Sequence, residues 1–283
     1  MILTHDIGTS IELVDPALGL ARWRYVYAGK PKPYVHPLRT PAGHCLTNFE
    51  PNDHLWHRGL WYTFKFINGE NFWEEHEPYG TQRTRSFSVI IHEPGGQLDF
   101  RTALDWLRPS GEAVFHEERE LGYEALGDEA YALDFATTLT AAADLTLDRT
   151  PFTTWGGYGG LILRGNRNWV ETRLLFPDGS TSDRPTGIRA VWCDLSGTFD
   201  GGLEQTGGVA IFDHPANPRH PTPWYGTTGS GHYVNAAFLF HEPLQVDAGE
   251  TLHFRYRVLV HDGIWDVPRL QAAYDAYSRG EGH

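Results

Sequence analysis

Histidine and arginine side chains are concentrated in the stretch PNDHLWHRGLWYTFKFINGENFW, residues 51 to 73. His54 and His57 stand three positions apart, and Arg58 follows directly. Imidazole titrates near neutral pH, so it can act as an acid, a base or a metal ligand. A guanidinium can stabilise an enolate or another oxyanion. His57 is therefore the first candidate for an acid/base group, with Arg58 and Arg39 as candidates for anion stabilisation.

Aromatic residues alternate with these polar ones. Trp61 and Trp73 could each stack on the apolar face of a sugar ring while polar neighbours bond its hydroxyl groups, although either could be core packing. A second ring-rich segment, WGGYGGLILRG at 155–165, places glycines around Tyr158, and glycines let a backbone approach a ligand closely. Its spacing does not match GxGxxG, so we expect no phosphate-binding loop there.

A proline-rich loop, IFDHPANPRHPTPWYG from residue 211 to 226, displays further polar side chains. Prolines stiffen such a loop and lower the entropic cost of presenting side chains to a ligand. Asp213, or Glu242 in the segment FHEPL, could orient His57 or act as its partner. We expect residues 54–58 and 213–220 to line one cavity, and the alternative is a rigid rim packed against the edge of the sheet.

These segments supply the candidate site residues. The catalytic candidates are His57, Arg58, Asp213, His214 and Glu242, and the candidates for binding substrate are Arg39, His54, Trp61, Asn71, Trp73, Tyr158, Asn217, His220, Trp224 and His241. No metal ligand is assigned and no cofactor is expected. A divalent metal is the alternative, since the same histidines with a carboxylate could hold zinc or ferrous iron, but the helical HExxH motif is absent.

The elements that position these residues are strands. Apolar and polar residues alternate along WYTFKFI, LDFRTALDW, YALDFATTL and TLHFRYRVLVHDG, as is typical of antiparallel sheets with one packed face. Tyr62, Phe64 and Phe66 should anchor the first of these strands in the core. Helical pattern is clear only near the C-terminus, where Asp266 can cap a helix over about 266–279. We therefore predict an all-β fold, one large antiparallel β-sandwich domain over residues 1–283 with a short C-terminal helix.

Composition restricts the partners. The chain has 283 residues, with 23 lysines and arginines against 36 aspartates and glutamates, which gives a net charge of −13. Such a field repels nucleic acid and anionic membranes, so neither is an expected partner. The rings and polar groups described above favour a small-molecule carbohydrate ligand. No run of about 18 apolar residues could span a bilayer. No signal peptide is visible, and we expect a cytoplasmic protein. Cys45 and Cys193 could form at most one disulfide.

Several motifs resemble a known bacterial family, the PmoA-like domains labelled as methane oxygenase. They are HPLRTPAGH, DHLWHRGLW, NGENFW, GYGGLILR, GGVAIFDHPANPRHPTPW and EPLQVDAGETLHFRYRVLVHDG, and they span roughly residues 34 to 263. A methane oxygenase subunit is a membrane protein of many helices, which this chain does not resemble. What the resemblance implies is a galactose-mutarotase-like supersandwich, a fold shared by epimerases, lyases, hydrolases and non-catalytic sugar binders.

Three hypotheses follow. The first, which we favour, is a carbohydrate-active enzyme of epimerase, lyase or hydrolase type that uses histidine acid/base chemistry on a sugar or keto-sugar. The second is a non-catalytic sugar-binding or sensor protein with the same pocket. The third is a histidine-ligated metalloenzyme. Replacing His57 separates the first two, because a catalyst would lose turnover whereas a binder could lose only affinity.

Overall fold

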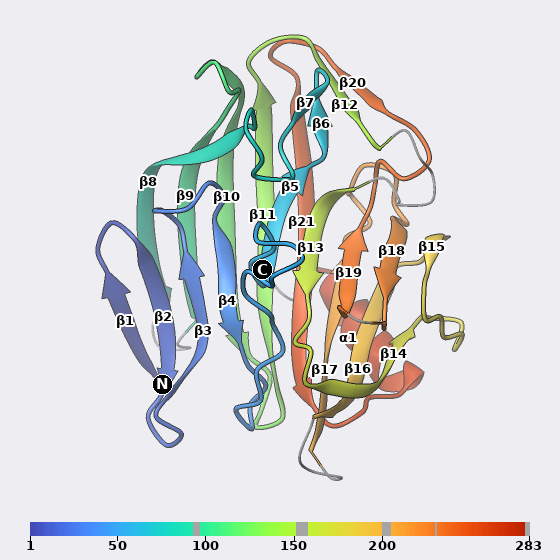
Figure 1. Ribbon diagram of the computed structural model, residues 1–283. Helices are drawn as coiled ribbons and strands as arrows, with labels where there is room; N and C mark the ends of the chain where they lie inside the picture. Colours follow the sequence, from blue (N-terminus) through green and yellow to red (C-terminus); the bar gives the residue numbers. More distant parts are fainter. Residues whose placement is uncertain (93–96, 151–157, 200–204, 230, 281–283) are drawn as a thin grey trace.

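The computed structural model describes residues 1–92, 97–150, 158–199, 205–229 and 231–280. Part of the glycine-rich segment, residues 155–157 with Trp155, lies outside this range. Within it, strands form three antiparallel sheets, and the two largest lie over one another in Figure 1. The predicted all-β sandwich is therefore confirmed. No helix in the described residues is long and apolar enough to cross a bilayer.

The first large sheet has nine strands and carries most of the residues of interest. In spatial order they are β1 (Ile2–Asp6), β2 (Ser10–Asp15), β3 (Leu20–Val26), β4 (Tyr34–Leu38), β5 (Leu60–Phe64), β13 (Gly159–Arg164), β19 (Tyr233–Ala236), β18 (Pro223–Thr227) and β15 (Thr186–Arg189). Strands from the beginning, the middle and the end of the chain are thus neighbours in this sheet.

The second large sheet has eight strands, several of them long. In spatial order they are β14 (Trp169–Leu175), β16 (Trp192–Phe199), β17 (Thr206–Asp213), β21 (Thr251–Asp262), β11 (Ala130–Ala141), β10 (Ala113–Ala125), β9 (Gln97–Leu107) and β8 (Thr81–His92). A small third sheet of β20 (Leu244–Val246), β12 (Leu145–Asp148), β6 (Phe66–Ile67) and β7 (Glu70–Asn71) lies at one end, at the top of Figure 1.

The C-terminal helix α1 (Val267–Ser278) is close to the predicted range. Asp266 caps it by accepting a hydrogen bond from the Arg269 amide at 3.0 Å, and Pro268 lies in its first turn. Leu270 and Tyr274 of α1 pack on Phe212 of β17, so the helix covers the outer face of the eight-stranded sheet. The sandwich core lies between the two large sheets.

Period-two alternation explains this core. Along β17, Val209 and Ile211 face the nine-stranded sheet, whereas Phe212 packs under the helix. Tyr62 and Phe64 of β5 are fully buried in the same core, each contributing on the order of 1.5–3 kcal/mol.

Two expectations about individual side chains need correction. The prediction that Phe66 lies in the core is wrong, because β5 ends at Phe64 and Phe66 begins β6 of the small sheet, where it is only half-buried. Lys65 lies over its ring at 4.9 Å. Cys45 and Cys193, which could have formed one disulfide, are both free thiols.

Candidate functional site

A cavity of about 270 Å³ opens on the outer face of the nine-stranded sheet. In β13 and β19, Leu161, Leu163 and Val234 face the sandwich core, whereas Ile162 and Tyr233 face the opposite side. The residues that line the cavity are Asp53, His54, Trp56, His57, Trp73, Glu74, Tyr158, Arg164, Arg184, Tyr225, Thr227, Gly231 and Tyr233. Its size is close to the lower end of ligand pockets, roughly 300 Å³, and suits a single small ring.

Backbone hydrogen bonds hold the His57 loop rigidly against the sheet. The amide of His57 donates to the carbonyl of His54 at 3.0 Å, and the carbonyl of Gly59 accepts from the Arg164 amide of β13 at 2.7 Å. Gly59 has φ = 68°, and a Cβ there would lie 2.3 Å from the carbonyl oxygen of Val35. Only glycine fits this position, which fixes the direction of the chain on either side of it.

His57 lies deep in the cavity wall with only 4% of its surface exposed. Among the described residues, neither of its ring nitrogens has a hydrogen-bond partner. Burial holds the pKa of His57 well below its usual value, and the nearby His54 and Arg164 lower it further. The imidazole is therefore neutral at pH 7, with one nitrogen able to donate a hydrogen bond and the other able to accept one.

Aromatic rings surround this imidazole. Trp61 packs behind it at 4.9 Å between ring centroids, and Tyr233 stacks beside it at 5.8 Å. Trp73 and Tyr158 stack on each other at 4.7 Å and form a further wall of the cavity. The hydroxyl of Tyr233 is buried without a hydrogen-bond partner in the described part of the chain.

Charged groups complete the lining. Arg164, at the end of β13, donates to Asp53 at 3.2 Å, and Arg167 donates to the other oxygen of the same carboxylate at 2.6 Å. Glu74 forms an ion pair with Lys65. Both carboxylates that line the cavity are thus already bonded to cationic side chains.

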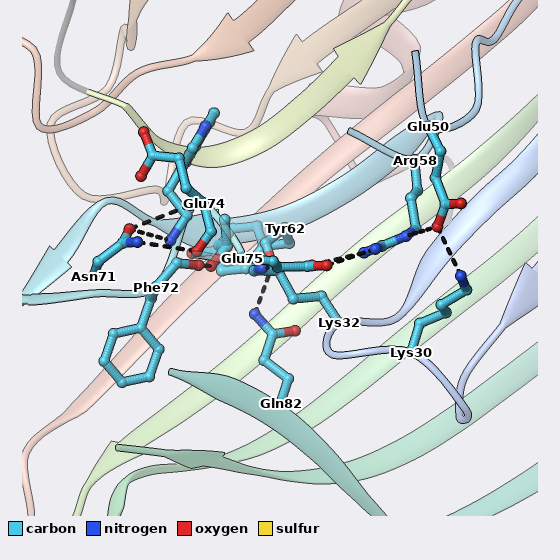
Figure 2. A network of polar contacts seen from close by, with 12 residues as sticks. Lys30, Lys32, Glu50, Arg58, Tyr62, Asn71, Phe72, Glu74, Glu75 and Gln82 are labelled. Carbon is cyan, nitrogen blue, oxygen red and sulfur yellow. Dashed lines mark hydrogen bonds and ion pairs between the residues drawn. The ribbon is translucent and has the colours of Figure 1, made fainter. Parts of the chain in front are cut away.

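Arg58 does not line this cavity, contrary to the role expected for it. Figure 2 shows its guanidinium between two carboxylates. It donates to both oxygens of Glu75 at 2.7 and 2.6 Å and to Glu50 at 2.8 Å. Lys32, itself buried, adds a bond to Glu75 at 3.0 Å. The network engages three of the five N–H donors of Arg58 with carboxylates and makes it a support for the His57 loop.

The structure does not bring the proline-rich loop to the cavity. Asp213 is fully buried and accepts bonds from Asn217 at 2.7 Å, from His220 at 2.8 Å and from the Thr222 amide at 2.8 Å. These polar groups satisfy one another, so the loop is a self-contained cluster. His214 lies elsewhere, in a hollow on the outer face of the eight-stranded sheet beside α1.

Some of the other candidate residues line the cavity and others do not. His54, Trp73 and Tyr158 line the cavity, and Trp61 contacts His57 from behind. The remaining candidates make contacts of their own away from it: Arg39 with the Gly43 carbonyl, Asn71 with the Glu74 backbone, Trp224 with the Ala190 carbonyl, Glu242 with Arg219, and His241 with the Phe240 ring.

The geometry does not favour a metal centre. In the described residues, no group of three or more histidine, cysteine, aspartate or glutamate side chains is arranged to hold an ion. The rings of His54 and His57 stack at 4.6 Å with 22° between their planes. Because nitrogen lone pairs lie in the ring plane, two stacked imidazoles do not point at a common ion.

Sequence reasoning missed several lining residues, above all Arg164 and Tyr233. The two are paired across β13 and β19, 69 positions apart in the chain by their numbers, so no local motif connects them. A weak signal existed in GGLILRG, where strand alternation from the buried Leu161 and Leu163 places Ile162 and Arg164 on the other face.

Comparison with known proteins places the chain in a family. A model described as "Family of unknown function (DUF6807)" matches residues 17–275, so the chain belongs to this family. Its name differs from the PmoA-like label that the motifs resemble. No curated protein matches the sequence.

Solved structures show only distant likeness. A galactose mutarotase related enzyme from Lactobacillus acidophilus matches with 10% identity over 92% of this chain and 97% of its own, at a TM-score of 0.40. A protein named as a kojibiose phosphorylase from the human microbiome matches with 10% identity over 78% of this chain, at 0.35, and a polysaccharide lyase with 9% over 94%, at 0.34. The chain spans only 26% and 34% of these last two. Similarity this low carries no inference about activity.

Proposed function

We propose that the cavity binds a carbohydrate of monosaccharide size and that His57 exchanges a proton with it. The observation that carries this proposal is the buried His57, a residue of the cavity wall whose two ring nitrogens have no partner among the described residues. A buried polar group without a partner costs about 1–3 kcal/mol, which a ligand hydroxyl or carbonyl would recover. The rings of Trp73 and Tyr158 supply an apolar surface for the sugar.

The chemistry supported best is proton transfer rather than glycoside hydrolysis. A neutral imidazole can accept a proton from a carbon next to a carbonyl group and return it to the same face, and inversion of that carbon needs a second acid on the opposite face. Glycoside hydrolysis usually needs a carboxylic acid that carries a proton. Asp53 and Glu74, the carboxylates of this cavity, are instead bonded to arginine and lysine. An epimerase or a lyase therefore fits the lining better than a hydrolase.

The test is a ligand panel followed by an exchange experiment. Neutral hexoses and pentoses, with their uronic and aldonic acids, are titrated into the protein by calorimetry and tryptophan fluorescence. Compounds that bind are then incubated with enzyme in D2O and followed by NMR. We expect saturable binding and deuterium incorporation at one carbon. Binding without exchange would identify a non-catalytic sugar binder, and no binding by any compound would overturn the proposal.

Replacing Tyr233 by phenylalanine should have effects of opposite sign on stability and binding. The change removes a buried hydroxyl that has no partner in the described chain but keeps the ring beside His57. The free energy of unfolding should therefore rise by about 1 kcal/mol, while affinity for the bound sugar falls about tenfold because one hydrogen bond to it is lost. Denaturant unfolding and calorimetry measure the two quantities, and an unchanged affinity would remove Tyr233 from the binding site.

A further inference from the structure

Arg164 is a buried cation in the cavity wall whose hydrogen-bonding capacity is only partly used. Only 6% of its surface is exposed, and its Nε has no partner among the described residues. Within the part of the chain that the structure describes, its single carboxylate contact is the 3.2 Å bond to Asp53. Asp53 is a weak counter-ion for it, because 45% of that side chain is exposed and Arg167 binds it at the shorter distance of 2.6 Å.

Arg58 provides a matched comparison within the same protein. It is also 6% exposed, but two carboxylates bind it through three hydrogen bonds. Although burial alone would lower its pKa, the bonds to Glu75 and Glu50 raise the pKa of Arg58. Burial lowers the pKa of Arg164, and Asp53 does not offset this. Of these two equally buried guanidinium groups, Arg58 has two carboxylate partners in the described chain and Arg164 has one.

The charges of the residues that line the cavity also favour an anionic ligand group. Asp53 and Glu74 each bond to a cation outside the cavity lining, Arg167 and Lys65. Arg184 is a second cation of the lining, so two carboxylates that are shared with outside cations face two guanidinium groups, in a chain whose overall charge is −13. A negatively charged ligand group placed here would supply the missing counter-charge.

The fold fixes the position of the Arg164 guanidinium. Backbone bonds fix Arg164 on both sides, since its amide donates to Gly59 at 2.7 Å and its carbonyl accepts from Asn48 at 2.9 Å. The guanidinium lies against the bare backbone of Gly231, where a Cβ would come within 2.5 Å of Nη2. Gly231 also lines the cavity, so the guanidinium is part of the cavity wall.

We propose that the ligand of this cavity is a sugar acid, a uronic or aldonic acid, whose carboxylate is bound by Arg164. The inference rests on the proposed carbohydrate site and narrows its substrate class. A planar guanidinium matches a carboxylate with two parallel hydrogen bonds, whereas a hydroxyl uses only one. The same carboxylate, bound near His57, would offset the cost of charging the buried imidazole and make it a stronger base.

The test compares sugars that differ only at one carbon. Glucuronate is measured against glucose, and galacturonate against galactose, by calorimetry at pH 7. We expect one uronate to bind at least about tenfold more tightly than its neutral partner. In Arg164→Gln that uronate should lose about tenfold in affinity, whereas the neutral sugar should change less than about twofold. Arg164→Lys should retain part of the preference, because the charge remains.

Two further variants keep the result interpretable. Arg167→Gln removes the other guanidinium on Asp53, which does not line the cavity; because Asp53 is then left to Arg164 alone, the preference for the acid should fall, but less than in Arg164→Gln. If Arg164→Gln does not fold, Gly231→Ala displaces the guanidinium while keeping Arg164, and should weaken uronate binding selectively. Equal affinity for acid and neutral sugar would overturn this inference but leave the carbohydrate site standing. Failure of both kinds of sugar to bind would overturn both.

Discussion

Replacing Glu117 by glutamine should lower the free energy of unfolding by about 3–5 kcal/mol. Glu117 lies on β10 between the two large sheets and is fully buried. It accepts bonds from Arg119 at 2.7 and 2.9 Å, from Trp106 at 2.6 Å and from Thr137 at 2.7 Å. Glutamine would present an NH2 group to donors and leave the charge of Arg119, itself 2% exposed, without a counter-ion.

Glu120→Gln on the same strand is the matched control. Glu120 pairs with Arg101 at 2.9 Å, but both side chains are more than half exposed, so its loss should cost less than about 1 kcal/mol. Equilibrium unfolding in urea measures both variants. A loss below about 1 kcal/mol in Glu117→Gln would mean that water or a rearranged side chain compensates Arg119, and that the buried pair does not stabilise the core.

Glu117 and Arg119 are inward-facing charged residues that the sequence pattern alone does not predict. The apolar alternation predicted the inner faces of β11 and β21 well, because every second residue from Tyr131 to Leu139, except Thr137, and from Leu252 to Val260 is apolar and buried. On β10 the same alternation places Glu117 and Arg119 inward with Phe115 and Leu121. A charged residue at an inward position is not distinguished from a solvated one until all its partners are known, and Trp106 and Thr137, which also bond to Glu117, come from neighbouring strands.

Only the part of the candidate site that lies within one local stretch of the sequence was predicted. The stretch around His57 combines polar residues and rings in one loop, and that loop does form one wall of the cavity. The proline-rich loop has a similar composition, but Asp213 and His220 bond to each other. Composition does not show whether a polar group lacks a hydrogen-bond partner or already has one in a neighbouring side chain, because this depends on geometry.

Replacing His57 by asparagine should reduce turnover by about 10²–10⁴-fold, the usual contribution of a positioned acid or base. Asparagine keeps hydrogen-bonding atoms near the same place but has no titrating group. The loss of ring contacts with Trp61 and Tyr233 should cost only about 1–2 kcal/mol at neutral pH. The rate of deuterium exchange into whichever sugar the wild type binds measures turnover, and calorimetry measures the affinity, which should largely remain.

The same variant has a second readout in its acid stability. Because the pKa of His57 is lowered mainly by burial, the unfolded chain takes up a proton near pH 6.5 that the folded protein resists. Wild-type stability should therefore fall as the pH decreases below about 6.5, and part of this fall should disappear in His57→Asn. His36, whose pKa burial lowers to about 4, still contributes in the variant, so the acid-unfolding midpoint moves only partly to lower pH.

His253→Asn is the control for both readouts, since His253 is exposed on the eight-stranded sheet and bonds to Thr138 at 3.0 Å. It should change neither the exchange rate nor the acid midpoint. An unchanged exchange rate in His57→Asn would show that another group transfers the proton. An unchanged acid midpoint would show that folding does not lower the pKa of His57, so that burial does not hold the imidazole neutral. A lower midpoint together with lost exchange is expected only if the same neutral, buried ring carries the chemistry.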